Sequence, residues 1–476
     1  MKRNIIIGCI AAVFSLSACD NYLDIVPKGE SVLNQTSDYL GLIEDIYGYP
    51  IQSEWYLCGE ATSYNMELLE NYSSPLHSTA FYWDEDFDRA PYMTATGNGD
   101  MYTVCYRKIS NYNIIIQNIN KSEGSDDDKR YGMAQAKIMR AYAYYRLVQA
   151  FGAVTILRDN NQTDLSRSTA NAVNKYALED LQYGIDNMPR IRPNQNEHKG
   201  AVTAFSAEML AAKIHLNMGD YAKVEELTDD IIEHGNFSLY PDFYQLFKIP
   251  GKLCDESIFE SQMTDFGNGS GDLIDPGEWF TCQGPKNSGS NINGWGDCGI
   301  LKSFRDWAYN RGETIRATTS FLMADSTTPD GDYIKPQTNP TNTDCWNGKA
   351  YTPLSQLTPG RTKYGTNNNV RIFRYADVLL MNAEAKIKNG KSGDAPFNEV
   401  RRRAQMPELT NVTFEQVIDE RRMELVCEWG ERYNDLVRTG LAKTELKGWS
   451  EDKALLPLPF NQYTQIPDLL KEPKDE

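Results

Sequence analysis

Residues 129–151 read KRYGMAQAKIMRAYAYYRLVQAF and carry a clear helical signal. Apolar side chains recur along this stretch at spacings of three and four residues, as they do on the core-facing side of a helix. They are Ala134, Ile138, Ala141, Tyr145 and Val148. Residues 102–121 repeat the pattern, and residues 124–128 supply a turn with acidic side chains before the second helix. We therefore predict two helices that pack against each other.

Three more helices are predicted directly after this pair. Residues 170–188 and 201–217 show the same apolar spacing, and Gly219 and Asp220 turn the chain into a further helix over residues 221–234. Helices of this length with small residues at their contacts indicate stacked helix hairpins. The tetratricopeptide unit of about 34 residues is the nearest template.

The chain changes character in its second half. Residues 236–370 are dense in Gly, Asn, Pro, Thr and Trp, and a loop-rich stretch of this length is usually functional. Helical order returns over 371–389, 394–404 and 413–429, the last opened by a capping-box pattern from Thr413 to Gln416. We expect a helical-repeat half over 19–240 and a second half over 241–476, packed as one globular unit. The second half divides into a ligand-face insertion (241–370) and closing helices (371–476).

The first residues are typical of a lipoprotein signal peptide. Lys2 and Arg3 precede an apolar run that is too short to span a bilayer, and the run ends in Leu16-Ser17-Ala18-Cys19. This ending resembles a bacterial lipobox, in which the cysteine thiol receives a diacylglycerol. We predict removal of residues 1–18 and lipid anchoring through Cys19, since two or more acyl chains give stable membrane attachment.

The composition and the missing motifs argue against nucleic-acid binding, metal binding and catalysis. The 476 residues include 66 acidic and 48 basic side chains, a formal charge of −18, so the surface repels nucleic acid. No HExxH, G-x-S-x-G, P-loop or paired Cys/His spacing occurs in the sequence. We expect no metal, no cofactor, no nucleic-acid partner and no catalytic activity.

Six segments, in order along the chain, resemble one family. They are Cys19–Asp24 with Pro27; Lys137–Tyr145 closing on Phe151-Gly152; Arg374–Ala385; Asn398–Ala404; Glu420–Leu425 followed by Glu428, Gly430, Arg432, Asp435-Leu436 and Arg438; and Leu456-Pro-Leu-Pro459. The ordered set is similar to the SusD/RagB-like outer-membrane lipoproteins of Bacteroidetes nutrient-uptake systems. The resemblance is weakest over 236–370.

This resemblance implies a mostly α-helical fold. About four tetratricopeptide-like helix pairs would form a superhelix, and long irregular insertions would build a ligand face on it. It further implies a lipid-anchored protein exposed on the outer membrane, which binds oligosaccharides or, in some branches, peptides. Such proteins form a lid on a SusC-type TonB-dependent transporter.

Candidate ligand-binding residues lie in two aromatic loops. Flat aromatic rings stack on the apolar face of a sugar, while amides and carboxylates pair with its hydroxyl groups. The candidates are Tyr82, Trp83 and Asp84 in the first loop and Trp279, Asn293 and Trp295 in the long insertion. Trp346 is a weaker candidate, and Trp429 and Trp449 are interpreted as structural. A neutral glycan is the leading ligand; a peptide ligand, a surface glycoside hydrolase and a structural adaptor are the alternatives.

The charged motif near the C-terminus also has an interpretation from its residues alone. Arg421 and Glu424 are three residues apart, and Glu428 and Arg432 are four apart, so each could pair along a helix. Apolar Leu425, Cys427 and Trp429 alternate with these charges. We therefore predict a partly buried ion-pair network that ties this helix to its neighbours, with a structural role.

Overall fold

The computed structural model describes residues 68–70 and 97–475, with gaps at 264–283, 286–293, 295–297, 337–343, 358–366, 429–430, 447–448 and 457. The described chain is mostly helical, with short two-stranded sheets and irregular segments. The predicted fold class is therefore confirmed. Among the described residues, no helix is both long enough and apolar enough to cross a bilayer.

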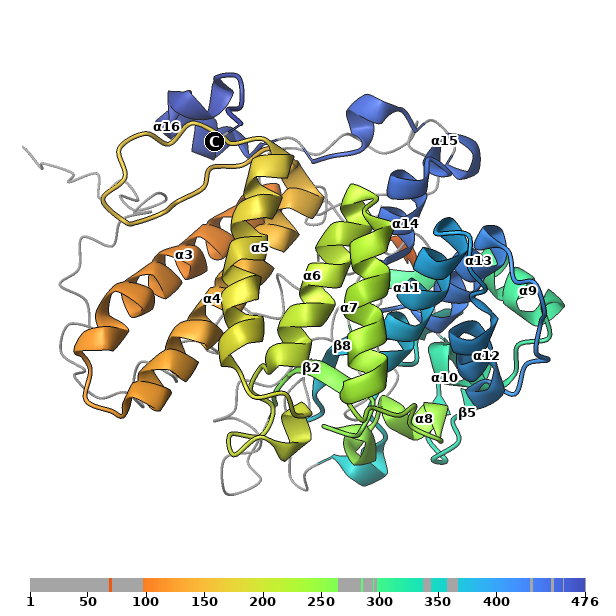
Figure 1. The fold of residues 1–476 in the computed structure, drawn as a ribbon. Coiled ribbons are helices and arrows are strands. Elements are labelled where there is room, and N and C mark those ends of the chain that lie inside the picture. The colour runs from red at the N-terminus through yellow and green to blue at the C-terminus, as the bar shows by residue number, and fades with distance from the viewer. Residues whose placement is uncertain are drawn as a thin grey trace, which may run out of the picture.

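A row of helices forms the scaffold (Figure 1). It consists of α3 (Gly97–Asn118), α4 (Asp126–Phe151), α5 (Ala170–Asn187), α6 (Ala204–Met218) and α7 (Tyr221–His234). Each helix packs against the next along the chain. All five helices expected from apolar periodicity are present, with ends that differ by a few residues.

Helix α4 shows why these segments are helical. The Ser125 hydroxyl accepts a hydrogen bond from the Asp128 amide at 3.1 Å, and the Asp128 carboxylate accepts one from the Ser125 amide, which together form a capping box.

Helix α5 approaches α4 closely at Gly184, where an added Cβ would lie 2.5 Å from Cγ1 of Ile138. Small residues thus set the helix spacing.

Helix α7 finds its next partner far along the chain. It packs against α11 (Tyr375–Lys388), which in turn packs against α12 (Asp394–Arg403) and α13 (Phe414–Glu424). Helix α14 (Glu431–Thr439) follows α13. The main hydrophobic core runs from α3 to residues of the C-terminal segment, so buried residues of both halves contribute to it.

Two predicted helix ends were wrong. Residues 371–374 belong to strand β8 (Val370–Arg374), which pairs antiparallel with β2 (Ser257–Ser261). Helix α13 ends at Glu424 rather than at 429, and Cys427 then takes a left-handed backbone conformation with φ of 62°. The capping box between Thr413 and Gln416 that opens α13 is confirmed.

The insertion between α7 and α11 contains short elements. Helices α8 (Phe243–Leu246), α9 (Lys302–Asn310) and α10 (Ile315–Ser320) alternate with strands β3 (Cys298–Ile300), β4 (Phe321–Met323), β5 (Ser326–Thr327), β6 (Tyr333–Ile334) and β7 (Cys345–Asn347). Strand β3 pairs with β1 (Leu68–Glu70), β4 with β7, and β5 with β6. The chain ends in α15 (Ala442–Glu445) and α16 (Phe460–Gln465).

Candidate functional site

The residues proposed from the sequence as the ligand platform lie outside the described part of the chain. These are Tyr82, Trp83, Asp84, Trp279, Asn293 and Trp295, and the lipidation candidate Cys19 lies outside it as well. The structure therefore neither groups nor separates them.

Of the other tryptophans named from the sequence, Trp429 lies outside the described residues, whereas Trp346 and Trp449 are described and both are structural. Trp346 in β7 is fully buried against Leu322, Ile334 and Tyr351, so the weaker candidacy of Trp346 as a ligand contact was wrong. Trp449 is half-buried against the main core, and its indole nitrogen donates a hydrogen bond to the Tyr433 hydroxyl at 3.3 Å, as expected for a structural residue.

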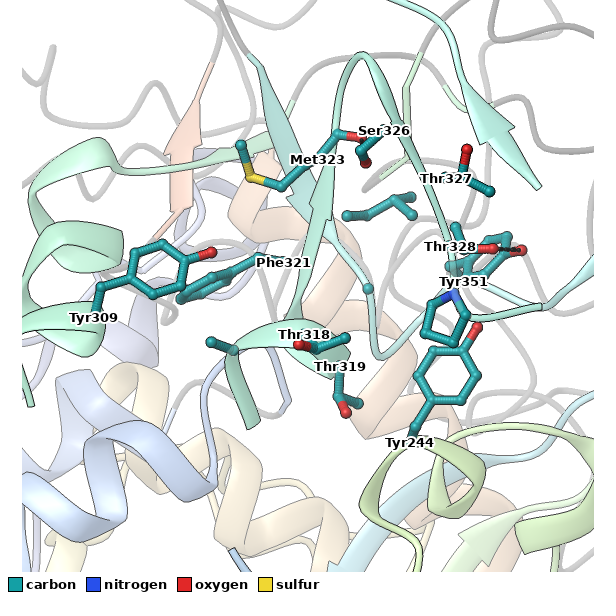
Figure 2. Close-up of a pocket in the computed structure, with 14 residues that line it drawn as sticks. Tyr244, Tyr309, Thr318, Thr319, Phe321, Met323, Ser326, Thr327, Thr328 and Tyr351 are labelled. Carbon is teal, nitrogen blue, oxygen red and sulfur yellow. Dashed lines mark hydrogen bonds between the residues drawn. The ribbon is translucent and has the colours of Figure 1, made fainter. Parts of the chain in front are cut away.

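The insertion contains a pocket of about 180 Å³ (Figure 2). Its wall combines aromatic rings with hydroxyl groups from α8, α9, α10, β4, β5 and the segment after β7. The lining residues are Tyr244, Tyr309, Ala317, Thr318, Thr319, Phe321, Leu322, Met323, Ser326, Thr327, Thr328, Pro329, Gly348 and Tyr351. None of these described lining residues carries a charged side chain.

The strand pair β4–β7 positions one side of the pocket. Phe321 and Leu322 lie opposite Asn347 and Trp346 in the antiparallel register. The chain then continues into Gly348, whose amide donates to the Ser320 carbonyl at 2.8 Å. An added Cβ at Gly348 would collide with the Thr319 carbonyl, so this close approach depends on glycine.

Tyrosines form the two ends of the pocket. Tyr309 is 52% exposed and makes an edge contact with Phe321, at 5.8 Å between ring centroids. At the other end Tyr351 donates a hydrogen bond to Asp332, whose carboxylate also accepts from the Leu354 amide at 2.9 Å. Figure 2 shows Tyr244 and Tyr351 near each other at this end and Tyr309 beside Phe321 at the other.

The Tyr351 end of the pocket combines protonated tyrosine hydroxyls with carboxylates behind them. Burial raises the pKa of Tyr244 and Tyr351 well above 10, so both hydroxyls keep their protons at neutral pH. The Tyr244 hydroxyl lies close to Asp330, and this neighbouring carboxylate raises the pKa of Tyr244 further.

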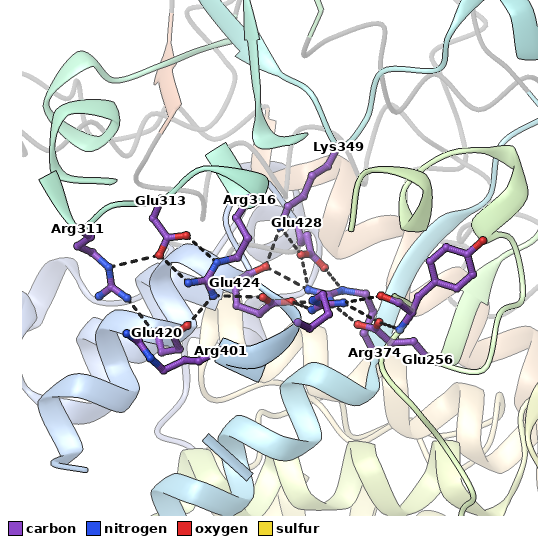
Figure 3. Close-up of polar contacts among 12 residues, drawn as sticks. Glu256, Arg311, Glu313, Arg316, Lys349, Arg374, Arg401, Glu420, Glu424 and Glu428 are labelled. Atoms are coloured by element: carbon purple, nitrogen blue, oxygen red, sulfur yellow. Dashed lines mark hydrogen bonds and ion pairs between the residues drawn. The ribbon is translucent and has the colours of Figure 1, made fainter. Parts of the chain in front are cut away.

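A buried ion-pair network lies beside the insertion (Figure 3). Arg374 at the end of β8 contacts three glutamates, with Nη1 at 2.6 Å from Glu256 and 3.1 Å from Glu424, and Nη2 at 2.7 Å from Glu428. Arg316 in α10 contacts Glu313 and Glu420, each at 2.6 Å. All of these side chains are buried. The network therefore connects the insertion to β8 and α13.

The predicted structural role of the charged C-terminal motif is confirmed, but its partners differ from the expected ones. Arg421 pairs with Asp377 at 2.6 Å and with Asp435 at 2.8 Å rather than with Glu424. Glu428 pairs with Arg374 and with Lys349, both at 2.7 Å. Because α13 ends at Glu424, residues 425–428 leave the helical path and reach distant partners.

Sequence reasoning missed the pocket residues. Tyr244, Tyr309 and Tyr351 were not among the candidates because the sequence contains 28 tyrosines and the choice fell on two loops that contain tryptophan. The Thr-rich segments 318–319 and 326–328, which lie between Tyr309 and Tyr351 in the sequence, were the available signal, since hydroxyl and aromatic side chains together are typical of sugar sites. In the described ranges, no group of His, Cys, Asp and Glu side chains is arranged to hold a metal ion.

Two family models match the chain. The model described as "SusD family" matches residues 299–455, and the model described as "Starch-binding associating with outer membrane" matches residues 21–216. The two matched ranges lie on either side of the first part of the insertion.

Individual proteins agree with these matches. A SusD-like protein of Bacteroides ovatus is 22% identical over 511 residues, which cover 91% of this chain and 82% of that protein. The starch-binding protein SusD of Bacteroides thetaiotaomicron is 34% identical over 84 residues, which cover 17% of this chain and 15% of that protein.

Solved structures establish the fold. Surface glycan-binding protein A from Bacteroides fluxus has a TM-score of 0.75 at 22% identity, covering 90% of this chain and 96% of its own. The corresponding protein from Bacteroides thetaiotaomicron in complex with laminarihexaose has a TM-score of 0.74 at 21% identity, covering 91% and 98%.

Proposed function

Because the chain belongs to the SusD/RagB-like family, we propose that it is a surface protein that binds a neutral oligosaccharide and does not cleave it. The outer membrane is named in the description of one matching model, and two structural neighbours are named for glycan binding. These names support glycans as the ligand class.

The pocket in the insertion is the observation that carries this proposal. Its lining combines the rings of Tyr309, Phe321 and Tyr351 with the hydroxyl groups of Thr318, Thr319 and Thr328, and it has no charged side chain among its described residues. Tyr309, which is 52% exposed, is the ring open to stacking on a sugar. A cavity of about 150 Å³ accommodates benzene, so about 180 Å³ suits one sugar ring. The uncharged lining favours a neutral ligand over a charged peptide.

The remaining rings of a longer glycan would bind on the aromatic loops. In this proposal Trp83 and Trp295, with Tyr82 and Trp279 beside them, stack on sugar rings, while Asp84 and Asn293 pair with hydroxyl groups. A few stacked rings and solvent-competing hydrogen bonds give an affinity of roughly millimolar to tens of micromolar. Modest affinity suits a protein that must release its cargo.

Delivery and anchoring complete the proposal. The protein would be anchored to the outer membrane through lipidated Cys19 and would pass the glycan to a SusC-type TonB-dependent transporter. Replacing Cys19 by Ala should release the protein from membranes or leave it unprocessed, as followed by fractionation and acyl labelling. Unchanged membrane retention without label at Cys19 would exclude this form of anchoring.

Calorimetric titration tests the ligand class. The purified protein without its signal segment is titrated with laminarihexaose, a xylogluco-oligosaccharide, maltohexaose and a set of peptides. Tyr309→Ala should weaken glycan binding by about 1–3 kcal/mol, as truncation of a contact hot spot does. Tyr333→Ala is the matched control, because Tyr333 is 49% exposed but lies outside the pocket lining.

Three outcomes would contradict the proposal. Equal affinity of wild type, Tyr309→Ala and Tyr333→Ala would separate the pocket from glycan binding. Binding of peptides alone would favour the peptide-binding alternative. Chromatography of the glycan after long incubation should show the intact chain; cleavage products that disappear on mutation of Asp or Glu residues would identify a glycoside hydrolase.

A further inference from the structure

Lys248 lies directly behind the pocket wall. It follows α8, and its side chain is fully buried. The ammonium donates to the Gly348 carbonyl at 2.7 Å and to the Tyr351 carbonyl at 2.6 Å. It also lies 4.8 Å from the ring centroid of Tyr244 and 4.9 Å from that of Tyr351. Every one of these contacts is made to a residue that lines the pocket.

This lysine differs from two other buried lysines, Lys349 and Lys213. Lys349 pairs with Glu428 at 2.7 Å, and Lys213 pairs with Asp377 at 2.7 Å. Lys248 has no carboxylate partner within 4.0 Å among the described residues, and carbonyl dipoles and ring faces surround its charge instead. Burying a cation without a counter-charge is costly. The carbonyl and ring contacts offset this cost only while they stay close to the ammonium, so the ammonium favours a wall in which these groups converge.

The consequence for the wall is geometric. One ammonium joins the segment after β7, through Gly348 and Tyr351, to α8, through Tyr244. These two segments are far apart in sequence and form the tyrosine end of the pocket. Without the ammonium, the rings of Tyr244 and Tyr351 and the carbonyls of Gly348 and Tyr351 would lose the one group that they all contact.

We infer that Lys248 is a positioning residue of the glycan pocket, which sets glycan affinity by holding Tyr244, Gly348 and Tyr351 without touching the ligand. The inference rests on the proposed function. It extends that proposal because it names the side chain that holds the pocket wall in place.

A pH dependence follows from the groups around Lys248. Burial and the neighbouring Arg371 lower the pKa of Lys248 well below 10.5, and Asp330 opposes this shift. The pKa values of Tyr244 and Tyr351 are raised, so these rings stay protonated while Lys248 loses its proton. The neutral amine has no cation–π attraction and donates weaker hydrogen bonds. Glycan affinity should therefore fall as the pH rises.

The experiment compares Lys248→Met with Lys349→Met and the wild-type protein. Dissociation constants for laminarihexaose, a xylogluco-oligosaccharide and maltohexaose are measured from pH 6 to pH 10, together with melting temperatures. Lys248→Met should bind at least tenfold more weakly at pH 7 and lose the pH dependence. Lys349→Met removes a second buried cation, whose ammonium contacts Glu424, Glu428 and the rings of Phe243 and Phe247, none of which lines the pocket. It should therefore melt earlier but keep the wild-type affinity and pH profile.

The outcomes separate the two proposals. If wild type binds and Lys248→Met binds equally with the same pH profile, the positioning role is overturned. If Lys248→Met does not fold, Lys248→Gln decides, because its amide can still donate to a carbonyl but carries no charge; wild-type affinity in this variant contradicts the inference. If neither wild type nor Lys349→Met binds any of the three glycans, the proposed function fails and this inference fails with it.

Discussion

The helical scaffold and the insertion are held together by different physical means. In α3 to α7 the side chains that meet are mainly Ala, Ile, Leu and Tyr, and they form one continuous apolar core. Between the insertion and α12 to α13 the contacts include many buried Arg–Glu pairs, such as Arg316–Glu420 and Arg403–Glu256, beside one small apolar cluster that contains Met423. Apart from the part around β2 that joins the main core, the described residues of the insertion form small apolar clusters, one of them shared with α13.

This difference has an energetic meaning. Apolar packing contributes in proportion to the area buried and tolerates small changes of shape. A buried ion pair gains little over an apolar pair of the same shape, but the loss of one partner leaves an uncompensated charge. The insertion should therefore be more sensitive than the scaffold to single substitutions, and the variants below test this contrast.

The largest effect is expected for Arg374→Met. Glu256, Glu424 and Glu428 would lose their shared partner, and breaking such a buried network costs about 3–5 kcal/mol. Urea denaturation measures the loss. The control is Arg402→Met, whose pair with Glu408 at 3.1 Å is exposed and should contribute less than about 1 kcal/mol. Similar losses for both variants would contradict the importance of burial.

The free energy of unfolding should change with pH in opposite directions for one glutamate of the ion-pair network and one glutamate of the scaffold. Burial alone would raise the pKa of Glu424, but Arg403, Arg374 and Arg316 outweigh it and lower the pKa to about 2. The stability from this group is complete above pH 4.5 and is lost as the pH falls toward 2. Glu424→Gln should therefore show a shallower acid loss than wild type in urea unfolding from pH 7 to pH 3.

Glu208 in scaffold helix α6 gives the opposite case. Burial raises its pKa to about 7 despite its contact with Arg190. Its favourable contribution is complete below pH 4.5 and is lost as the pH rises through 7. Glu208→Gln should remove a decline in stability between pH 5 and pH 8. The same pH slope in both glutamine variants would refute the contrast between the regions.

A moderate effect is expected for Gly184→Ala in the scaffold. The new methyl group would press on Ile138, and overpacking of this kind costs about 1–3 kcal/mol. Thermal unfolding measures the cost. The double variant with Ile138→Ala should lose less than the sum of the two single losses, because the obstructing atoms are gone. Additive losses would mean that the helices move apart instead.

The smallest effects are expected for the helix caps, and they should be equal in the two regions. Ser125→Ala in front of α4 and Thr413→Ala in front of α13 each remove a side-chain acceptor from a helix amide. Each should cost about 1 kcal/mol by urea denaturation, and Ser125→Gly should cost less. A much larger loss at Thr413 would show that the ion-pair network depends on the start of α13.

The scaffold was predictable because its signals are local. The periodic apolar residues of 129–151 and the capping box from Thr413 to Gln416 each lie within a few turns of one helix. The error at residues 371–374 has the opposite cause: Phe373 and Arg374 continue the apolar pattern of α11, but pairing with β2 more than a hundred residues away makes them a strand.

The candidate site likewise divides into residues predicted from the sequence and residues found only in the structure. The aromatic loops with Trp83 and Trp295 were chosen because their residues cluster in sequence, and that platform stays a prediction. The sequence placed Trp346 among the weaker candidates, but β7 buries it completely. Tyr309 and Tyr351 became candidates only when β4 and β7 brought their segments together.

The amino-acid sequence by itself determined the helical scaffold, the family and the structural role of the charged motif. Apolar periodicity and helix caps are properties of neighbouring residues within one helix. The family motifs are likewise short local segments, and their order along the chain is visible in the sequence. The tertiary structure alone decided which glutamate each arginine meets, where the pocket lies and why Lys248 is buried behind it. Those contacts join segments separated by tens to more than a hundred residues, as between Lys248 and Tyr351 or Arg374 and Glu256, so no local pattern specifies them.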